Sequence, residues 1–446
     1  MGNIYNFLKN VLTDIQSENK ENRSFIFLTL LFVTIPLSLG VNNISLILFL
    51  GSILMLLKKN SFVFSKEIFL PIMLFVLMLF SYFWSIDKAL TIKAIPKEIA
   101  LLLIPIAFLI LQPISENFKN KILKYYSYSI VLFVAYHLLR AIIRFFILKD
   151  TSVFFYHGEY NSDVGIVSKE LNAIHVSVFV AIAFFYFYTS KEKNSVNNII
   201  SSTLFGFIVL LSSKNIILVF ILLLLIHFFF FSKSANKMRL RNIFLFLIVI
   251  GFVFSFGKIK ERFQLEFQTN SNKSISSNVI KGLPEGVHNL SISEAWFNEK
   301  FTPNDFFPGT AFRVYQARLF FEFIKEENIF WTGFGLNASY KKLEEKAVYY
   351  NVFQGNNEIE GYQKKNFHNQ YIQVFAELGL FGFLILVLML SFNLKKAIKH
   401  KDFMHIAFAV LMISLFLTES FLWRQRGVVF FTVFYCLFNS TKKRVN

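Results

Sequence analysis

Residues 215–232 decide the fold, and they read NIILVFILLLLIHFFFFS, a run without a charged side chain. A helix needs about 20 apolar residues to cross a bilayer, so this stretch predicts a transmembrane helix. The composition extends the prediction to the whole chain, because 55% of the residues are hydrophobic and only 17% are charged. A soluble domain has roughly 25% charged residues. A disordered chain, a fibrous repeat and an ordinary soluble enzyme are therefore excluded.

The same criterion, applied along the chain, predicts an all-α polytopic membrane protein with about 12 spans. The expected spans are 25–40, 43–57, 68–84, 95–112, 125–148, 172–190, 198–213, 215–232, 242–257, 370–392, 403–421 and 426–440. They divide the chain into a cytoplasmic segment 1–24, nine spans within 25–257, an external loop domain 258–369, three spans within 370–440 and a cytoplasmic tail 441–446.

Charge gives the orientation. With both termini in the cytoplasm, the predicted inside segments hold 22 basic and 7 acidic residues, whereas the large external loop holds 14 basic and 13 acidic residues. Basic residues concentrate in cytoplasmic loops of membrane proteins. The net charge of +18 is therefore an orientation signal and does not indicate binding to nucleic acid.

Several other classes of protein lack support in the sequence. The single cysteine, Cys436, excludes an internal disulfide, and the N-terminal segment has no apolar core of a signal peptide. The histidines are too scattered for a zinc site, and no phosphate-binding glycine motif is present, so we expect no metal and no cofactor. A transporter or flippase, the alternative of another class, would show pseudo-symmetric halves, and no such repeat is visible.

Within the external loop, residues 311–329 have a helical period, with Phe312, Tyr315, Leu319 and Phe323 on one stripe. We expect this helix to lie on the mouth of the bundle or at the membrane interface, with its apolar face toward the membrane. It ends at a TGFG turn, residues 332–335, and a second charged helix is expected near 338–348.

His368 lies where the external loop enters the tenth span, with Asn366 or Asn369 as a candidate cap of that helix. A neutral histidine at this place can accept a proton, and the alternative is an interfacial polar residue without chemistry. Arg140, on the fifth span, faces either an anionic headgroup or the membrane interface. Glu419 belongs either to a local ion-pair network or to a substrate contact.

Residues 368–382, HNQYIQVFAELGLFG, resemble the signature of the O-antigen ligase and O-antigen polymerase superfamily. Upstream, Arg313 followed by residues 331–335, WTGFG, resembles the arginine helix and glycine turn of that family. Residues 211–215, LSSKN, stand where many members have a Ser-Arg-Gly turn, so Lys214 replaces an arginine. The helix before Gly333 is longer than usual, which leaves Arg318 as a competitor of Arg313.

The resemblance implies a GT-C-like bundle in the inner membrane with a periplasmic active site. It implies a metal-independent, inverting glycosyltransferase whose donor is a glycan on undecaprenyl diphosphate. His368 would be the general base, and Arg313, Lys214, Arg318 and Arg140 would be the candidates for holding the diphosphate. Supporting roles are expected for four further residues: His175, Glu377, Glu419 and Asn369. His175 has packing or capping as its alternative.

The acceptor stays open at the level of sequence. The resemblance fits a ligase that transfers O-antigen to lipid A-core, a polymerase that uses a second lipid-linked glycan, or transfer to a protein hydroxyl. All three use the same chemistry, and the single dominant loop between spans nine and ten favours the ligase. The expected partners are these lipid-linked substrates and the membrane lipids, without nucleic acid.

Overall fold

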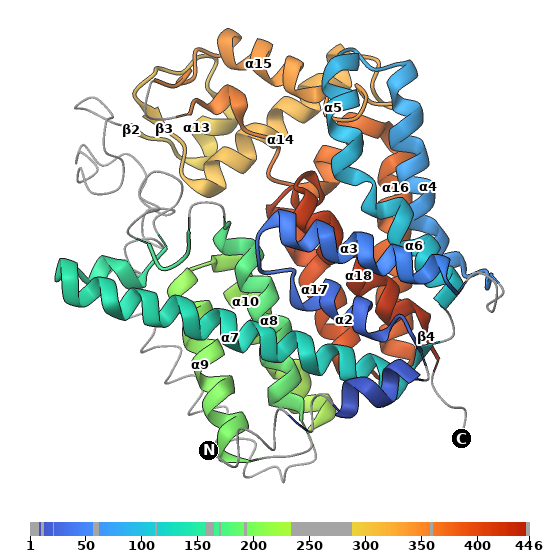
Figure 1. Cartoon of the computed structure of the whole chain (residues 1–446). Helices are drawn as coiled ribbons and strands as arrows, with labels where there is room; N and C mark the ends of the chain where they lie inside the picture. The colour runs from blue at the N-terminus through green and yellow to red at the C-terminus, as the bar shows by residue number, and fades with distance from the viewer. Residues whose placement is uncertain are drawn as a thin grey trace.

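The computed structural model describes residue 9 and residues 13–20, 22–56, 62–111, 114–156, 165–168, 171–190, 194–232, 288–356 and 360–442. These residues form helices joined by short turns, which confirms the all-α prediction (Figure 1). The strands are two residues long and pair in parallel: β1 (Ile114–Ser115) with β4 (Thr441–Lys442), and β2 (His288–Asn289) with β3 (Asp305–Phe306).

The apolar helices follow the predicted spans closely. They are α2 (Phe25–Val33), α3 (Leu39–Leu54), α4 (Lys66–Phe80), α5 (Lys88–Glu98), α6 (Ala100–Leu111), α7 (Glu116–Leu148), α8 (Ala173–Thr189), α9 (Ser195–Leu211), α10 (Lys214–Ile226), α16 (Gln370–Lys399), α17 (Phe403–Thr418) and α18 (Gln425–Ser440). Short helices η1 (Ser81–Phe83), η2 (Thr151–Phe154), η4 (His227–Phe231) and η6 (Phe421–Trp423) lie between or after them.

Five helical segments in the described residues are long and apolar enough to cross a membrane: Lys66–Phe83, Lys88–Leu111, Glu116–Leu148, Lys214–Phe231 and Gln370–Lys399. Four shorter apolar helices, α3, α8, α9 and α17, accompany them. The expected span 242–257 lies outside the described residues, so the total of 12 stays a prediction.

Two spans differ from their predicted form. Helix α2 has only nine residues, which is too short to cross a bilayer alone. Helix α7 has 33 residues, which corresponds to roughly 50 Å at 1.5 Å per residue, and it runs obliquely across the bundle in Figure 1. A count of apolar residues does not report tilt, because tilt depends on the neighbouring helices.

Helix α18 lies at the centre of the bundle, where every residue from Gly427 to Ser440 is buried. Phenylalanine rings fill the space around it, as in the contacts of Phe434 with Phe32 and Phe408, whose ring centroids lie 4.8 and 5.7 Å away. Aromatic pairs at such distances add to the packing energy beyond burial alone. The turn from α17 to α18, which carries the candidate site, is therefore fixed to a well-packed core.

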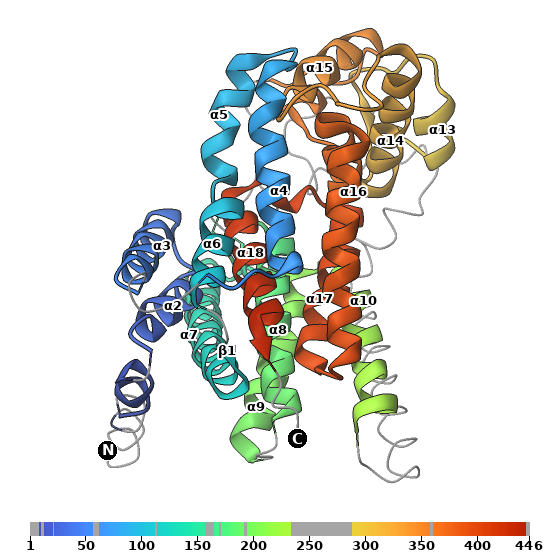
Figure 2. The same ribbon diagram turned by 90° about the vertical axis from the view of Figure 1, so that its right-hand side faces the viewer.

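The domain that the sequence predicts to be external contains α13 (Ile292–Phe297), α14 (Gly309–Glu326), α15 (Ser339–Tyr349) and η5 (Tyr362–Lys364), and lies beside α5 and the N-terminal end of α16 (Figure 2). Helices α14 and α15 match the two helices predicted from sequence. The predicted stripe of α14 is buried, but it faces a second hydrophobic core within this domain. The expectation of an apolar face lying on the membrane is therefore wrong for α14.

A turn clamps this domain onto α16. The backbone of α16 is interrupted at Gly379, whose φ of 65° lies in the left-handed region. The opened backbone bonds to the turn: Phe334 N–H donates to Ala376 O at 2.8 Å, and Leu380 N–H donates to Phe330 O at 2.8 Å. The TGFG turn, residues 332–335, and the α16 segment around Gly379 thus contact each other directly.

The other side of the turn is held by the connection between α4 and α5 and by α5 itself. Trp84 Nε1–H donates to Thr332 O at 2.8 Å, and Thr91 Oγ1–H donates to Leu336 O at 2.7 Å. The external domain is therefore fastened to two parts of the bundle that lie far apart in the sequence.

Replacing Gly379 or Gly333 with alanine should destabilise the protein strongly. A Cβ on Gly379 would lie 2.2 Å from the Trp331 carbonyl carbon, and one on Gly333 would lie 2.3 Å from that of Glu377. Both residues also have positive φ, so we expect a loss of about 3 kcal/mol or more and a clearly lower melting temperature in detergent. Gly206→Ala is the control, since nothing lies within 4 Å of its Cβ position. Equal melting temperatures for all three variants would contradict the clamp.

Candidate active site

The candidate residues meet at the outer end of α17. The last carbonyls of a helix have no partner inside the helix and must be satisfied from elsewhere. Arg313, on the first turns of α14, donates from Nε and Nη2 to Thr418 O at 3.0 and 2.9 Å. Asn369 Nδ2–H, at the start of α16, donates to Leu417 O at 3.1 Å. The need to satisfy these carbonyls brings two of the predicted residues together.

Helix α10 joins the same place through Asn215. Its side chain donates to Ser414 O at 3.0 Å and to Thr418 Oγ1 at 2.8 Å, and it accepts from Ser414 Oγ–H at 2.8 Å. Lys214 is the first residue of α10 and precedes this anchor. The structure therefore brings Lys214 to the end of α17 where Arg313 binds.

His368 sits just before α16 in a constrained backbone conformation. Its φ is 46°, which is uncommon for any residue other than glycine. The N–H of His368 donates to Asn366 Oδ1 at 2.8 Å. Asn369 caps the helix, because its Oδ1 accepts from the N–H groups of Tyr371 and Ile372 at 3.0 and 3.1 Å. The predicted cap is thus confirmed for Asn369, while Asn366 holds the turn.

The imidazole of His368 pairs with a buried carboxylate. Nδ1 lies 3.3 Å from Glu419 Oε2, and Glu419 is only 3% exposed in the turn that follows α17. Burial alone would raise the pKa of Glu419, but the hydrogen bond from His368 outweighs burial, the Arg313 charge adds to its effect, and the pKa is lowered to about 2. Glu419 therefore stays ionised and orients the ring, with Nε2 of His368 on the opposite side.

His175 lies behind this pair, on α8. It is 3% exposed, its ring lies 4.3 Å from the ring of Phe421, and its Nε2 has no hydrogen-bond partner in the described residues. His175 is therefore close enough to influence the site, while its burial fits the packing alternative.

The structure separates the two candidate arginines of α14. Arg318 donates to Glu322 at 2.9 Å, to Asn298 O at 2.7 Å and to Tyr350 Oη at 2.9 Å, all within the external domain. It also stacks over the Tyr350 ring at 4.5 Å. Arg318 is thus part of the domain core, and Arg313 is the arginine at the site.

Arg140 is not part of the cluster. It lies on α7, one turn after His137, which contacts Ile166 O. No hydrogen bond or ion pair joins Arg140 to Arg313, Lys214 or His368 in the part of the chain that the structure describes. Its assignment to the diphosphate therefore stays an untested prediction.

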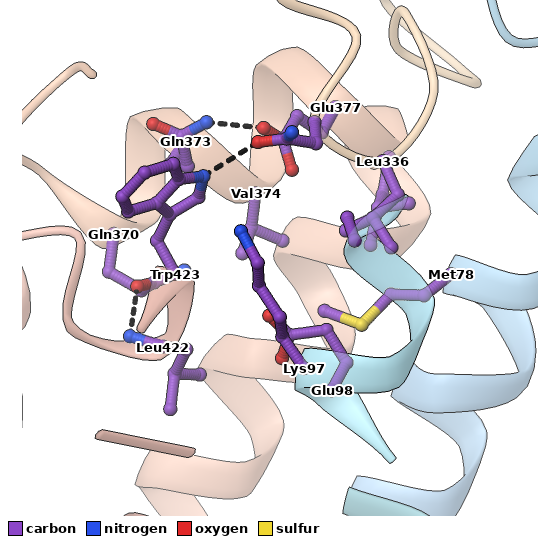
Figure 3. A pocket seen from close by; sticks show the side chains of 13 residues that line it. Met78, Lys97, Glu98, Leu336, Gln370, Gln373, Val374, Glu377, Leu422 and Trp423 are labelled. Atoms are coloured by element: carbon purple, nitrogen blue, oxygen red, sulfur yellow. Dashed lines mark hydrogen bonds between the residues drawn. The ribbon is translucent and has the colours of Figure 1, made fainter. Parts of the chain in front are cut away.

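Glu377 lies about two helical turns beyond the His368 turn on α16 and lines a small cavity (Figure 3). The cavity offers about 10 Å³, room for about one water molecule, between α4, α5, α16 and η6. Glu377 accepts from Ser339 Oγ–H at 3.3 Å and from Gln373 Nε2–H. Glu98 faces the same cavity, and its Oε2 has no partner among the described residues.

Sequence reasoning missed the roles of Gln373 and Thr418. Gln370, Gln373 and Glu377 are spaced i, i+3 and i+7, so they form one polar face in an otherwise apolar span. Polar side chains inside a membrane helix commonly mark function, and this signal was available. Thr418 acts mainly through its carbonyl, which gives no sequence signal.

The arrangement combines cations with an oriented base. Helices α10, α14 and α16 all begin beside the end of α17, so three positive helix ends converge there with Arg313 and Lys214. His368 and its carboxylate lie at the same place. Among the described residues, no group of three or more His, Cys, Asp or Glu is placed to hold a metal ion. The site can hold an anion and accept a proton beside it.

Comparison with known proteins supports the family resemblance. A family model described as O-Antigen ligase matches residues 199–387. The matched range runs from α9 into α16 and includes Lys214, Arg313 and His368, so it confirms the resemblance seen in the sequence. Glu419 lies beyond it. No curated relative matches the chain.

Proposed function

Because the chain belongs over residues 199–387 to the O-antigen ligase family, we propose that it is a membrane glycosyltransferase acting on lipid-linked glycans. The donor is a glycan on undecaprenyl diphosphate, and the acceptor is a hydroxyl on the periplasmic side of the inner membrane. Both termini face the cytoplasm, in agreement with the basic inside segments. Residues 258–369 then form the periplasmic domain.

One observation carries this proposal: a cluster of positive groups converges beside an oriented histidine. Arg313 and Lys214 approach the end of α17 together with three helix N-termini. A departing diphosphate is an anion that needs such groups, because no nucleotide-binding motif is present to hold it. The Arg313 guanidinium is held in place by Thr418 O and by Gly309 O, to which Nη1 donates at 2.8 Å, so it supplies a fixed positive charge, whereas Lys214 supplies a point charge on a flexible stem.

In the reaction, His368 takes the proton of the acceptor hydroxyl as the oxygen attacks the anomeric carbon of the donor sugar. A carbon–oxygen bond forms to the acceptor, and the bond from the anomeric carbon to the diphosphate oxygen breaks with its electron pair. Attack opposite the leaving group inverts the anomeric centre. Glu419 holds the imidazole with Nδ1 occupied and stabilises the imidazolium that forms.

We propose lipid A-core as the acceptor, which makes the protein an O-antigen ligase. Support for this choice comes from the single large loop domain, which brings Arg313 and His368 to one place at the end of α17. A polymerase would use the same residues with a second lipid-linked glycan as its acceptor. The two functions differ only in what carries the attacking hydroxyl.

A deletion strain distinguishes these acceptors in one gel. In a host that makes surface polysaccharide, we expect the deletion to remove polymer linked to lipid A while polymer on the lipid carrier accumulates. Lipid A-core that carries a single repeat would instead identify a polymerase. Complementation with the wild-type gene is the control. An unchanged glycan profile would sink both assignments.

A further inference from the structure

Gln373 bridges the two chain segments that carry the catalytic pair. It lies on the first turn of α16 and is 1% exposed. Its Oε1 accepts from Phe367 N–H at 3.3 Å and from Ser420 Oγ–H at 3.4 Å. These two residues directly precede His368 and directly follow Glu419. One amide oxygen therefore ties together the segments on which both partners depend.

Glu377 determines which way that amide points. The NH₂ group of Gln373 donates to Glu377 Oε1, as Figure 3 shows, and lies 3.4 Å from Ser339 Oγ. Glu377 Oε1 accepts this hydrogen bond, so it holds the NH₂ group on its own side and directs the Gln373 oxygen toward the turn at His368. Without this acceptor, nothing would hold the Gln373 amide in the orientation in which its oxygen accepts from Phe367 N–H and Ser420 Oγ–H.

The turn at His368 needs such support. A histidine with positive φ persists only when its surroundings hold it there. Within the described residues, Asn366 and Asn369 hold the turn from its two ends, and Gln373 holds it from beneath. A small shift of a general base relative to its substrate reduces the rate without changing how the substrate binds.

We propose that Glu377 and Gln373 are positioning residues: the buried carboxylate orients the amide, and the amide holds His368 against Glu419. This inference rests on the proposed function, because it assigns what the pair does for the transfer step. Neither residue touches the substrate. Among the described residues, no hydrogen bond or ion pair joins Arg313 or Lys214 to either of them, so we expect donor binding to be independent of the bridge.

The first test is Gln373→Leu in the purified full-length enzyme with a polyprenyl-diphosphate donor. We expect kcat to fall about 10- to 100-fold while KM for the donor changes less than about 3-fold. Gln370→Leu is the matched control, because Gln370 is also buried on α16 and accepts from Leu422 N–H at 2.7 Å, yet does not bridge to Phe367. This control should keep kcat within about 3-fold of wild type.

The second test uses rescue. Glu377→Gln keeps an acceptor for the Gln373 NH₂ group and should keep most of the activity, whereas Glu377→Leu should lose as much as Gln373→Leu. The double variant Gln373→Leu/Glu377→Leu should be no worse than either single variant, since all three break one unit. Stoichiometric donor binding by each variant shows that the protein is folded.

The outcomes distinguish a failure of the bridge from a failure of the proposed function. Normal kcat in Gln373→Leu, an equal loss in Gln370→Leu, or additive losses in the double variant would overturn the bridge. If His368→Ala is inactive in the same assay, the proposed function survives that result. If His368→Ala transfers glycan at the wild-type rate, the proposed function itself fails.

Discussion

His368→Ala should lower the rate of glycan transfer by about 1,000-fold or more, which is within the range for loss of a general base. The imidazole lies beside Arg313 at the end of α17, and Glu419 already occupies its Nδ1, so under the proposed function Nε2 is the nitrogen left to accept the proton. The rate is measured with purified enzyme, a lipid-linked donor and lipid A-core. Donor binding should persist, because Arg313 and Lys214 remain in place.

A second histidine of the external domain provides the control for that experiment. His288 lies on β2 and contacts Asp305 at 3.1 Å, within the domain and apart from the α17 end. His288→Ala should therefore transfer glycan at close to the wild-type rate. If both histidine variants lose activity equally, or if His368→Ala keeps its activity at normal protein levels, His368 is not the base.

The sequence pattern predicts which faces are buried, but not what covers them. One apolar face of α14 is formed, as predicted, by Phe312, Tyr315, Leu319 and Phe323. The same stripe suits a membrane surface or a neighbouring helix, because both are apolar. The structure shows a core built with residues such as Phe307, Tyr350 and Phe367, which come from separate segments of the loop. Such long-range partners carry no periodic signal.

The candidate site likewise has a part that local sequence predicts and a part that only the structure shows. A motif located His368, and helix-capping chemistry located Asn369, because both depend on local sequence. The choice between Arg313 and Arg318 depends on which way α14 faces, and only the contacts with Thr418 O and Tyr350 decide it. Backbone carbonyls hold much of the cluster together. They are the same in every residue type, so no sequence pattern could have predicted them.

Arg313→Ala should lower kcat by about 100-fold or more, because removal of one preorganised donor to a developing anion has an effect of this size. Arg313→Lys should recover only part of the rate, since lysine restores the charge without the fork that reaches Thr418 O through both Nε and Nη2. KM for the donor should rise as well, because the diphosphate is bound by the same group before and during the transfer.

The neighbouring arginine makes this prediction selective. Arg318→Ala removes bonds to Glu322, Asn298 O and Tyr350 and should lower the free energy of unfolding by about 2 kcal/mol, discounted for partial exposure. Its kcat per folded enzyme should nevertheless stay near the wild-type value, because none of its partners reaches the end of α17. Measured on the same samples, Arg313→Ala should thus mainly lower kcat, whereas Arg318→Ala should mainly lower the melting temperature. If Arg318→Ala loses kcat while Arg313→Ala keeps it, the arginine assignment must be reversed, and the diphosphate would then lie over the external domain instead of at the meeting point of α10, α14 and α16.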